Sequence, residues 1–535
     1  MTGIAPGGTP PPPPPDDDGR IRTDVVIVGA GVAGLYAATC LPDHLDIVVI
    51  DKGVPGGDSG SSPWAQGGLA VAMGGDDSPA LHAQDTLRAG DGLCDPLAAD
   101  VLAREAPAHV VRLLELGADF DRLPGHIGSQ DPADLHLARE GGQQVARSVH
   151  RADATGAEMV RVLREAAAPR VHRQPGIVAS LGQDATGRVT GAWVVVGDEL
   201  RVIEARAVLL ATGGCGGLFA ATTNPEHATA DGLSLAAKAG AAVRDVEFVQ
   251  FHPTGLAVEG TWRFLLTEAL RGAGATLHDA EGRRFLADVH PDAELAPRHV
   301  VARAILERAG GRAWLDATHL GELGLTREFP TVLGGARQHG FDLASERVPV
   351  TPAAHYHVGG VRTDLDARTS LPGLYACGEV ASTGVHGANR MAGNSLSEAL
   401  VFGARAARAL ATELPDVHGP VGDPPRFGDD SADVEELRAC LRQDMWGRAG
   451  PARSGGGLLS LSEQLRSLRT ELADPARTPA AIELDHALRS SALIVRGATL
   501  RAESRGGHRR SDAPDTLAAW AGVHVEQVGS MEPRR

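Results

Sequence analysis

Apolar runs and a helical pattern alternate near the start of the chain. Val25–Val28 is continuously apolar, which predicts a parallel strand buried on both faces. A helical pattern follows as far as Leu41 and stops at Pro42, and Ile47–Ile50 predicts a second strand. The order of these segments predicts a strand–helix–strand unit.

Three glycines occupy the turn between that first strand and its helix. Gly29, Gly31 and Gly34 form the pattern GxGxxG, and Asp51 follows the second strand. Such glycines allow a tight turn, close approach to a pyrophosphate and close packing of helix on strand, and the acid can bind a ribose. The unit predicts a dinucleotide site and leaves NAD and FAD open. The alternative is a turn that only lets a helix pack on a sheet.

The pattern downstream predicts a mixture of helices, strands and one long loop. Helices are expected within Ser78–Gly117, over Asp153–Ala168 with Asp153 as N-cap, and over Asp231–Ala242. Lys52–Gly75 carries too many glycines and serines for a regular element and suits a loop that wraps a cofactor. An antiparallel meander is expected from four short strands, Ile177–Ser180, Gly191–Val196, Leu200–Ala205 and Ala207–Leu210.

Changes of composition divide the chain into parts. We expect a disordered Pro-rich tail over residues 1–20, a cofactor domain over 21–244 and 358–415, and an inserted domain over 245–357. A linker rich in proline, glycine and aspartate over 416–430 then leads to a largely helical domain over 431–535. The expected fold class is α/β.

Charge and cysteine usage exclude several kinds of partner. The formal net charge is −17 and no basic cluster lies beside aromatic residues, so we expect no nucleic acid partner. The five cysteines are scattered and form no CxxC pair, which favours a reducing cytoplasm and argues against a bound metal. With no apolar run of membrane-spanning length and no basic-then-apolar start, we expect neither a membrane span nor a signal peptide. An anionic substrate would need a local pocket of arginines.

Several motifs together resemble one family, the succinate dehydrogenase/fumarate reductase flavoproteins. In chain order they are the glycine-rich opening, SSPWAQGG, ATGG, FVQFHPT, LLTEALRG, PRHVVARAI, AHYHVGG and YACGEV with HGANRMAGNSLSEALVFG. The later segment RQDMWGRAGPARSGGGL is similar to that of the L-aspartate oxidases within this superfamily. The resemblance implies a Rossmann-like FAD-binding domain interrupted by an α+β capping domain, followed by a C-terminal helical domain.

The resemblance also implies how FAD is bound. Membrane-bound members of the superfamily tether FAD through a histidine, but Ser61 stands at that position here, so we expect FAD to be held non-covalently. The glycine motif and Asp51 predict the ADP end of the site. With the positions that match the family, the expected cofactor-binding residues are Gly29, Gly31, Val32, Ala33, Gly34, Asp51, Lys52, Ser61, Ser62, Gln66, Gly67, Gly68, Asp231, Glu379, Ser395 and Leu396.

A C4 dicarboxylate needs cations and hydrogen-bond donors at both of its ends, and arginine meets a carboxylate with two parallel hydrogen bonds. By resemblance, Arg298 lies at the reacting carbon as a catalytic residue, and Glu140 of the segment REGG orients aspartate through its ammonium group. Arginine stays protonated, so Arg298 acts in electrostatic positioning at least as much as in proton transfer. The residues expected to bind the substrate are His252, Thr267, Glu268, His355 and Arg390.

The function that the resemblance implies is FAD-dependent oxidation of L-aspartate to iminoaspartate by hydride transfer to flavin N5, with oxygen or fumarate as electron acceptor. By family context this is the first step of de novo NAD biosynthesis, with possible hand-off of iminoaspartate to quinolinate synthase. Two alternatives stay open. The chain could be a soluble fumarate reductase or succinate dehydrogenase flavoprotein subunit, or a catalytically silent flavoprotein.

Overall fold

The computed structural model describes residues 20–53, 60–258, 260, 262–429 and 432–529. The expected tail therefore lies, except for Arg20, outside the described residues. The predicted strand–helix–strand opening is present as β1 (Ile21–Val28), α1 (Val32–Cys40) and β2 (Ile47–Asp51), with β1 and β2 parallel. The α/β fold class is confirmed.

The largest sheet has the strand order β6-β2-β1-β9-β8-β7, and a further strand, β16, pairs with β9. β1, β2, β6, β9 and β16 run parallel to one another, whereas β7, β8 and β9 form the predicted antiparallel meander. The bounds are β6 (His172–Pro175), β7 (Ile177–Gln183), β8 (Val189–Val196), β9 (Glu199–Leu210) and β16 (Leu374–Ala376).

One strand replaces two of the predicted ones. Leu200–Ala205 and Ala207–Leu210 were expected as separate strands, but β9 is continuous. The reason is β1, which pairs with β9 on both sides of Arg206, at Ala205 and at Ala207. The polar side chain of Arg206 reaches Asp24 instead of breaking the strand.

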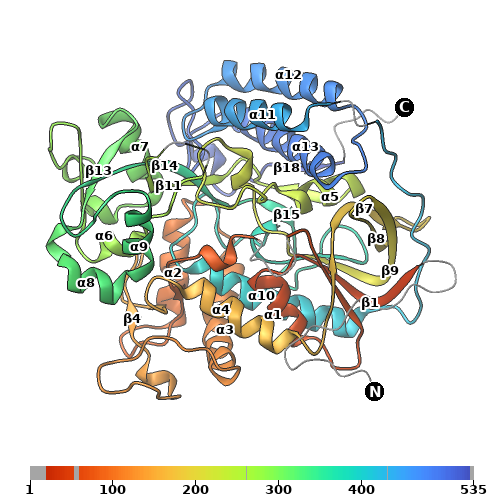
Figure 1. Cartoon of the computed structure of the whole chain (residues 1–535), viewed down its shortest axis with the longest axis horizontal. Coiled ribbons are helices and arrows are strands. Elements are labelled where there is room, and N and C mark those ends of the chain that lie inside the picture. Colours follow the sequence, from red (N-terminus) through yellow and green to blue (C-terminus); the bar gives the residue numbers. More distant parts are fainter. Residues whose placement is uncertain (1–19, 54–59, 259, 261, 430–431, 530–535) are drawn as a thin grey trace.

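Both faces of this sheet are buried, which explains the continuous apolar run in β1. Val25 and Ile27 pack with α1 and its helical neighbours, whereas Val26 and Val28 pack on the opposite side with Leu235. Figure 1 shows α1 grouped with α3, α4 and α10, and α2 packs on α3. Their bounds are α2 (Pro79–Ala89), α3 (Pro96–Glu115), α4 (Thr155–Ala167) and α10 (Asn394–Glu413). On the other face, α5 (Asp231–Ala239) ends before the predicted Ala242 because Gly240 takes a left-handed φ of 99°.

Asp153 does not cap the helix that follows it. The N-cap of α4 is Ala154, with no side-chain hydrogen bond. Asp153 instead accepts hydrogen bonds from the N–H groups of Thr331 (3.0 Å) and Val332 (2.6 Å), in the first turn of α9 (Pro330–Gln338). The predicted cap is therefore wrong for α4, because the carboxylate turns to a helix far along the chain.

A second sheet, with the order β11-β14-β13-β12, forms the lobe at the left of Figure 1. Its strands are β11 (Val249–Leu256), β14 (Val348–His357), β13 (Ala313–Asp316) and β12 (Thr276–His278). This lobe has a hydrophobic core of its own. The core is enclosed by α9 and three further helices, which are α6 (Glu268–Gly272), α7 (Arg298–Arg308) and α8 (Gly321–Glu328). This separate core supports our proposed capping domain over residues 245–357.

Three helices follow the linker and cover the top of the molecule in Figure 1. They are α11 (Val434–Ala449), α12 (Gly455–Leu472) and α13 (Pro479–Leu500), and their core includes Phe219 and Phe251 from the earlier parts. The predicted helical structure ends with α13. The chain then returns to the cofactor domain, where β18 (Glu526–Val528) pairs with β10 (Ala242–Arg244). The C-terminal part is thus tied to the cofactor domain.

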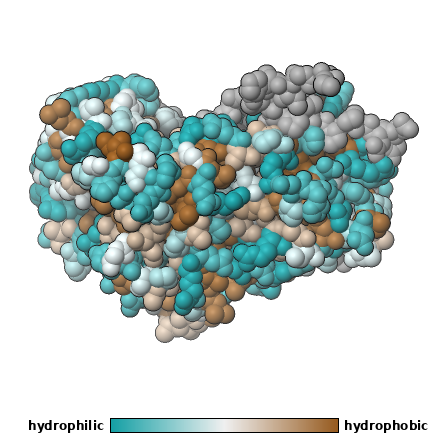
Figure 2. All heavy atoms as spheres, turned by 90° about the horizontal axis from the view of Figure 1, so that it is seen from below, coloured by the Kyte–Doolittle hydropathy of each residue, from teal (hydrophilic) through white to brown (hydrophobic). Residues whose placement is uncertain are grey.

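Two small sheets complete the fold. One has the order β17-β15-β10-β18, with β15 (Gly360–Arg362) and β17 (Ala381–Ser382). The other has the order β3-β5-β4, with β3 (Leu69–Ala70), β4 (Leu137–Ala138) and β5 (Ser148–Val149). Seen from below, hydrophilic residues are interspersed with smaller apolar patches (Figure 2). Within the described ranges, none of the helices has the length and apolarity needed to span a membrane.

Candidate active site

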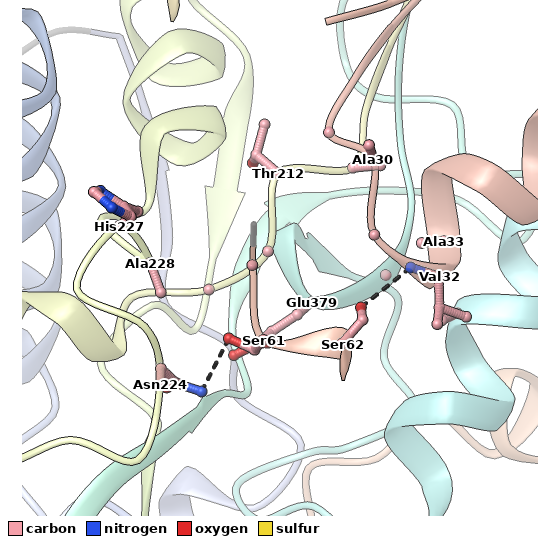
Figure 3. A pocket seen from close by; sticks show the side chains of 18 of the residues that line it. Ala30, Val32, Ala33, Ser61, Ser62, Thr212, Asn224, His227, Ala228 and Glu379 are labelled. Atoms are coloured by element: carbon pink, nitrogen blue, oxygen red, sulfur yellow. Dashed lines mark hydrogen bonds between the residues drawn. The ribbon is translucent and has the colours of Figure 1, made fainter. Parts of the chain in front are cut away.

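One cavity lies at the carboxyl ends of β1, β2 and β9, the edge where parallel sheets bind their ligands (Figure 3). The glycine turn, the start of α1 and the loop after β9 form one wall. Residues of the Lys52–Gly75 loop and of α10 form another. The predicted cofactor-binding residues that line it are Gly29, Gly31, Val32, Ala33, Asp51, Lys52, Ser61, Ser62, Asp231, Glu379, Ser395 and Leu396.

Two of the motif glycines are required by close backbone packing. A Cβ on Gly29, whose φ is 113°, would lie 2.2 Å from the carbonyl oxygen of Ala211. A Cβ on Gly34 would lie 2.1 Å from the carbonyl oxygen of Gly29. Gly34 is absent from the lining and instead lets α1 pack against the turn, as the motif predicts for its third glycine.

Serines from the long loop reach two places on the cavity wall (Figure 3). The Ser62 hydroxyl accepts a hydrogen bond from the N–H of Val32, the first residue of α1, at 3.1 Å. The Ser61 hydroxyl accepts one from the Asn224 amide at 3.1 Å. The loop is thereby attached to the helix N-terminus that is expected to meet a pyrophosphate.

Polar groups that the sequence did not single out also line this cavity. Asn224 Oδ1 and Thr212 Oγ1 are buried and have no hydrogen-bond partner among the described residues. Buried polar atoms need partners, so a polar ligand in this cavity would satisfy them. The wall therefore fits a dinucleotide such as FAD. The glycine-rich segment ATGG, which Thr212 belongs to, was the available signal.

Lys52 joins three separate segments at the β2 end of the cavity. Its ammonium group lies 2.7 Å from Asp231, 2.7 Å from Glu483 on α13 and 2.9 Å from the Thr229 hydroxyl. Burial lowers the pKa of Lys52, but the two carboxylates outweigh burial and hold that pKa above its usual value. The lysine therefore stays charged and fastens the C-terminal helices to the cofactor cavity. Sequence reasoning missed Glu483.

Glu379 presents a carboxyl group that is protonated more readily than usual. Burial raises the pKa of Glu379 to about 7, although one of its oxygens accepts the His357 N–H at 2.8 Å. A Cβ on Gly214 would lie 2.0 Å from that same oxygen. The backbone of the ATGG turn and the Glu379 side chain are thus in close contact at the cavity wall.

A second cavity lies between the cofactor domain and the left-hand lobe, and Arg390 lines both cavities. Of the predicted catalytic and substrate-binding residues, Glu140, Glu268, Arg298 and Arg390 line the second one. His355 lines the first. Arg298 and Arg390, with Arg88 and Arg139 in the same lining and the separate carboxylate of Glu140, suit an anionic ligand that also carries a cation.

Gln250 of β11 connects the two arginines, and sequence reasoning missed it. Its Oε1 accepts hydrogen bonds from Arg298 at 3.0 Å and from Arg390 at 3.2 Å. Its amide nitrogen donates to Asn389 and to the backbone carbonyl of Arg390. The available signal was a polar residue in the apolar start of FVQFHPT.

Both guanidinium groups have a further partner. Arg298 pairs with Glu268 at 2.5 Å, and Arg390 donates to the Ser395 hydroxyl at 2.9 Å. Burial raises the pKa of Glu268 in part, but Arg298 outweighs it and leaves that pKa below its usual value. Glu268 therefore orients Arg298 rather than offering a free carboxylate.

His252 and His355 lie side by side with ring centroids 4.9 Å apart. Burial and then the neighbouring Arg298 hold the pKa of each well below its usual value, so both rings are neutral near pH 7. His252 Nδ1 accepts the Thr254 N–H at 3.3 Å, which leaves Nε2 as the hydrogen-bond donor. Neutral rings supply hydrogen bonds but no charge.

Glu140 is fixed by the loop that precedes β3. One carboxylate oxygen accepts the N–H of Gly68 at 2.8 Å, and a Cβ on Gly67 would lie 3.3 Å from both oxygens. Burial and the nearby Glu268 raise the pKa of Glu140. Gly67 and Gly68 thus position this carboxylate and do not line the first cavity.

Several other predicted residues lie outside both cavity linings. Thr267 accepts the Ala269 N–H at 3.4 Å and caps α6. Gln66 is buried and its Oε1 has no partner among the described residues. The structure does not place Gly34, Gln66, Gly67, Gly68, His252 or Thr267 in either lining.

Comparisons with protein families match most of the chain. The family model described as "FAD binding domain" matches residues 24–396, and the one described as "Fumarate reductase flavoprotein C-term" matches residues 438–525. The chain is 46% identical to the L-aspartate oxidase of Caulobacter vibrioides over 499 residues, 92% of this chain and 93% of the relative. It is 44% identical to that of Streptomyces coelicolor, over 92% and 89% of the two chains.

Solved structures show the same fold. A variant of the quinol fumarate reductase of E. coli matches with a TM-score of 0.84 and 28% identity, over 96% of this chain and 97% of that one. Sdh1 of Mycobacterium smegmatis, solved in complex with UQ1, matches with a TM-score of 0.80 and 30% identity, over 96% and 95%.

Proposed function

The chain belongs to the L-aspartate oxidase family, within the succinate dehydrogenase/fumarate reductase flavoproteins, and from this membership we propose that it oxidises L-aspartate to iminoaspartate with FAD. The observation that carries the proposal is the group formed by Arg298, Gln250, Arg390 and Glu140. The two arginines share one amide oxygen, and Glu140 lines the same cavity. This arrangement offers two cations for two carboxylates and one anion for an ammonium group.

Each side chain has a defined part in binding. Arg298 and Arg390 bind the substrate carboxylates. The neutral ring of His355, which lines the first cavity, offers a further hydrogen bond, and the neutral ring of His252 lies beside it outside both linings. Glu140 attracts the ammonium group, which replaces the missing charge partner of this buried carboxylate. FAD in the first cavity supplies the hydride acceptor. Because Arg390 lines both cavities, the substrate is oriented where they meet.

The finer features of the function rest on the same membership. FAD is held non-covalently, since the residue at the tethering position, Ser61, is a serine that hydrogen-bonds Asn224. The reaction is the first step of de novo NAD biosynthesis, iminoaspartate passes to quinolinate synthase, and oxygen or fumarate accepts the electrons. A cytoplasmic location agrees with five cysteines that are all free thiols.

The test is the flavin spectrum of the purified protein during anaerobic addition of L-aspartate, with succinate as the matched dicarboxylate that lacks an amine. We expect L-aspartate to bleach the flavin and succinate to leave it oxidised. Bleaching by succinate and not by aspartate would instead indicate a succinate dehydrogenase or fumarate reductase flavoprotein. A spectrum unchanged by both would indicate a silent flavoprotein.

A further inference from the structure

A buried carboxyl group contacts Tyr356, a residue that lines the first cavity. Glu398, on α10, is fully buried and receives three side-chain partners. Thr383 donates to one of its oxygens at 2.5 Å. The Tyr356 hydroxyl donates to the other at 2.9 Å, and His386 Nε2 lies 2.9 Å from that same oxygen. Such convergence holds the carboxyl group of Glu398 at a fixed place inside the protein.

Tyr356 connects this carboxylate to the candidate active site. The Arg390 guanidinium carbon lies 4.5 Å from the centroid of the Tyr356 ring, in cation–π contact, and Tyr356 itself lines the first cavity. Burial and then Glu398 hold the pKa of Tyr356 well above its usual value, so the hydroxyl keeps its proton and remains a donor. One side chain therefore touches the carboxylate with its hydroxyl and the arginine with its ring.

The ring is a substantial part of what holds Arg390. The guanidinium group donates to Ser395 and Gln250, but its Nε is buried without a hydrogen-bond partner among the described residues. A cation is attracted to the electron-rich face of an aromatic ring, and the attraction is greater where water is excluded. A phenol that donates to a carboxylate gains electron density in its ring, because hydrogen-bonded groups polarise one another.

We infer that Glu398 is a positioning residue for Arg390 and acts through Tyr356. Glu398 fixes the plane of the phenol and strengthens the face that holds the guanidinium where it meets a substrate carboxylate. The inference rests on the proposed function, since it takes Arg390 to bind a dicarboxylate. It assigns a part in substrate affinity to a residue outside both cavity linings.

The same helix offers a matched control. Tyr375 donates its hydroxyl to Glu413 at 2.8 Å, near the other end of α10. This pair has the same phenol–carboxylate chemistry, and neither member lines either cavity. Glu413→Gln therefore makes the same substitution on the same helix, at an exposed residue that also pairs with Arg368, without touching Arg390.

The experiment compares the FAD-loaded wild type with Glu398→Gln, Tyr356→Phe, the double variant and Glu413→Gln. The readouts are FAD content, KM and kcat for L-aspartate, and the Kd of succinate from its perturbation of the flavin spectrum. For Glu398→Gln we expect unchanged FAD content and KM and Kd values raised about tenfold, because the buried cation–π contact is weakened and the ring less firmly placed, with kcat changed less. Tyr356→Phe should give a similar rise, because it keeps the ring but loses the hydroxyl.

The double variant separates positioning from general damage. If Glu398 acts through Tyr356, the double variant is no worse than either single variant. Effects that multiply, or a succinate Kd unchanged in Glu398→Gln, would overturn the inference and leave the proposed function intact. If Glu398→Gln does not fold, an unchanged Kd in Tyr356→Phe would overturn it equally. A wild type that binds neither aspartate nor succinate would sink the proposed function itself.

Discussion

We propose that Glu140, which lines the second cavity, sets aspartate apart from other C4 dicarboxylates. Its partner on the protein is a backbone N–H, and its pKa is raised by burial and by Glu268. A substrate ammonium group would relieve that unfavourable environment, whereas succinate or fumarate would add further negative charge beside it. The selectivity that we propose for Glu140 is therefore electrostatic.

Replacing Glu140 with glutamine should separate two activities. We expect kcat/KM for aspartate oxidation to fall about 100-fold, as for the loss of one partner of a buried charge pair. Fumarate reduction should be partly kept, because fumarate has no ammonium group. The measurement is kcat/KM for both reactions on the same preparation, with the exposed Glu165→Gln as control. Equal loss of both activities would remove Glu140 from selectivity.

Glu379 should make the stability of the FAD-free protein depend on pH. Burial raises its pKa from 4.5 to about 7 in the folded chain. Between these values the folded chain holds a proton that the unfolded chain has released, so the free energy of unfolding falls as pH rises through this window. The fall amounts to at most about 3 kcal/mol.

The matching measurement is urea unfolding at pH 5.5 and pH 8 for the wild type and Glu379→Gln. We expect the difference between the two pH values to be smaller in the variant, because glutamine cannot titrate. A difference of the same size in both proteins would mean that the pH dependence comes from other groups. Glu247, whose pKa burial also raises to about 7, is the foremost of these.

Elements whose pattern is local were predicted well, and long-range partners were not. The apolar run of β1 and the end of α1 before Pro42 depend only on residues close in sequence, so β1, α1 and β2 could be predicted from the sequence. Asp153 precedes α4 as an N-cap would, but it caps α9, which begins 177 residues later in the chain. An N-cap is predicted from its position directly before a helix, so a residue that caps a helix far along the chain cannot be recognised from sequence spacing.

That cap should be measurable in α9. Asp153→Ala leaves the N–H groups of Thr331 and Val332 without their acceptor, and we expect a loss of about 1–2 kcal/mol in stability. Asp153→Asn should keep most of it, since the amide oxygen still accepts. Hydrogen exchange at Thr331 and Val332 is the direct measurement. Asp433→Ala, which uncaps α11, is the control and should leave those two amides protected.

At the scale of the whole molecule, the site residues that could be predicted are those that lie within continuous sequence motifs. The glycine turn and the arginines were identified with their segments, but Gln250 gains its part only when Arg298 and Arg390 are brought to one amide oxygen. Glu483 likewise meets Lys52 only when α13 packs over the cofactor domain. Contacts between distant segments depend on the folded arrangement, which motif spacing does not encode.

Glu483 should therefore affect how tightly the whole protein retains FAD. Lys52 lines the first cavity, and Glu483→Gln removes one of its two carboxylate partners while Asp231 remains. The lysine would then be held less firmly between the cofactor domain and α13, and we expect the Kd of FAD to rise about tenfold, as for the loss of one charged hydrogen bond. The measurement is the fluorescence of FAD released on dilution.

Asp485→Asn is the control, because Asp485 lies on the same helix but pairs with Arg489 away from the cavity. If both variants released FAD alike, α13 would act only as packing, whereas a selective effect of Glu483→Gln would make the C-terminal helices part of the cofactor site.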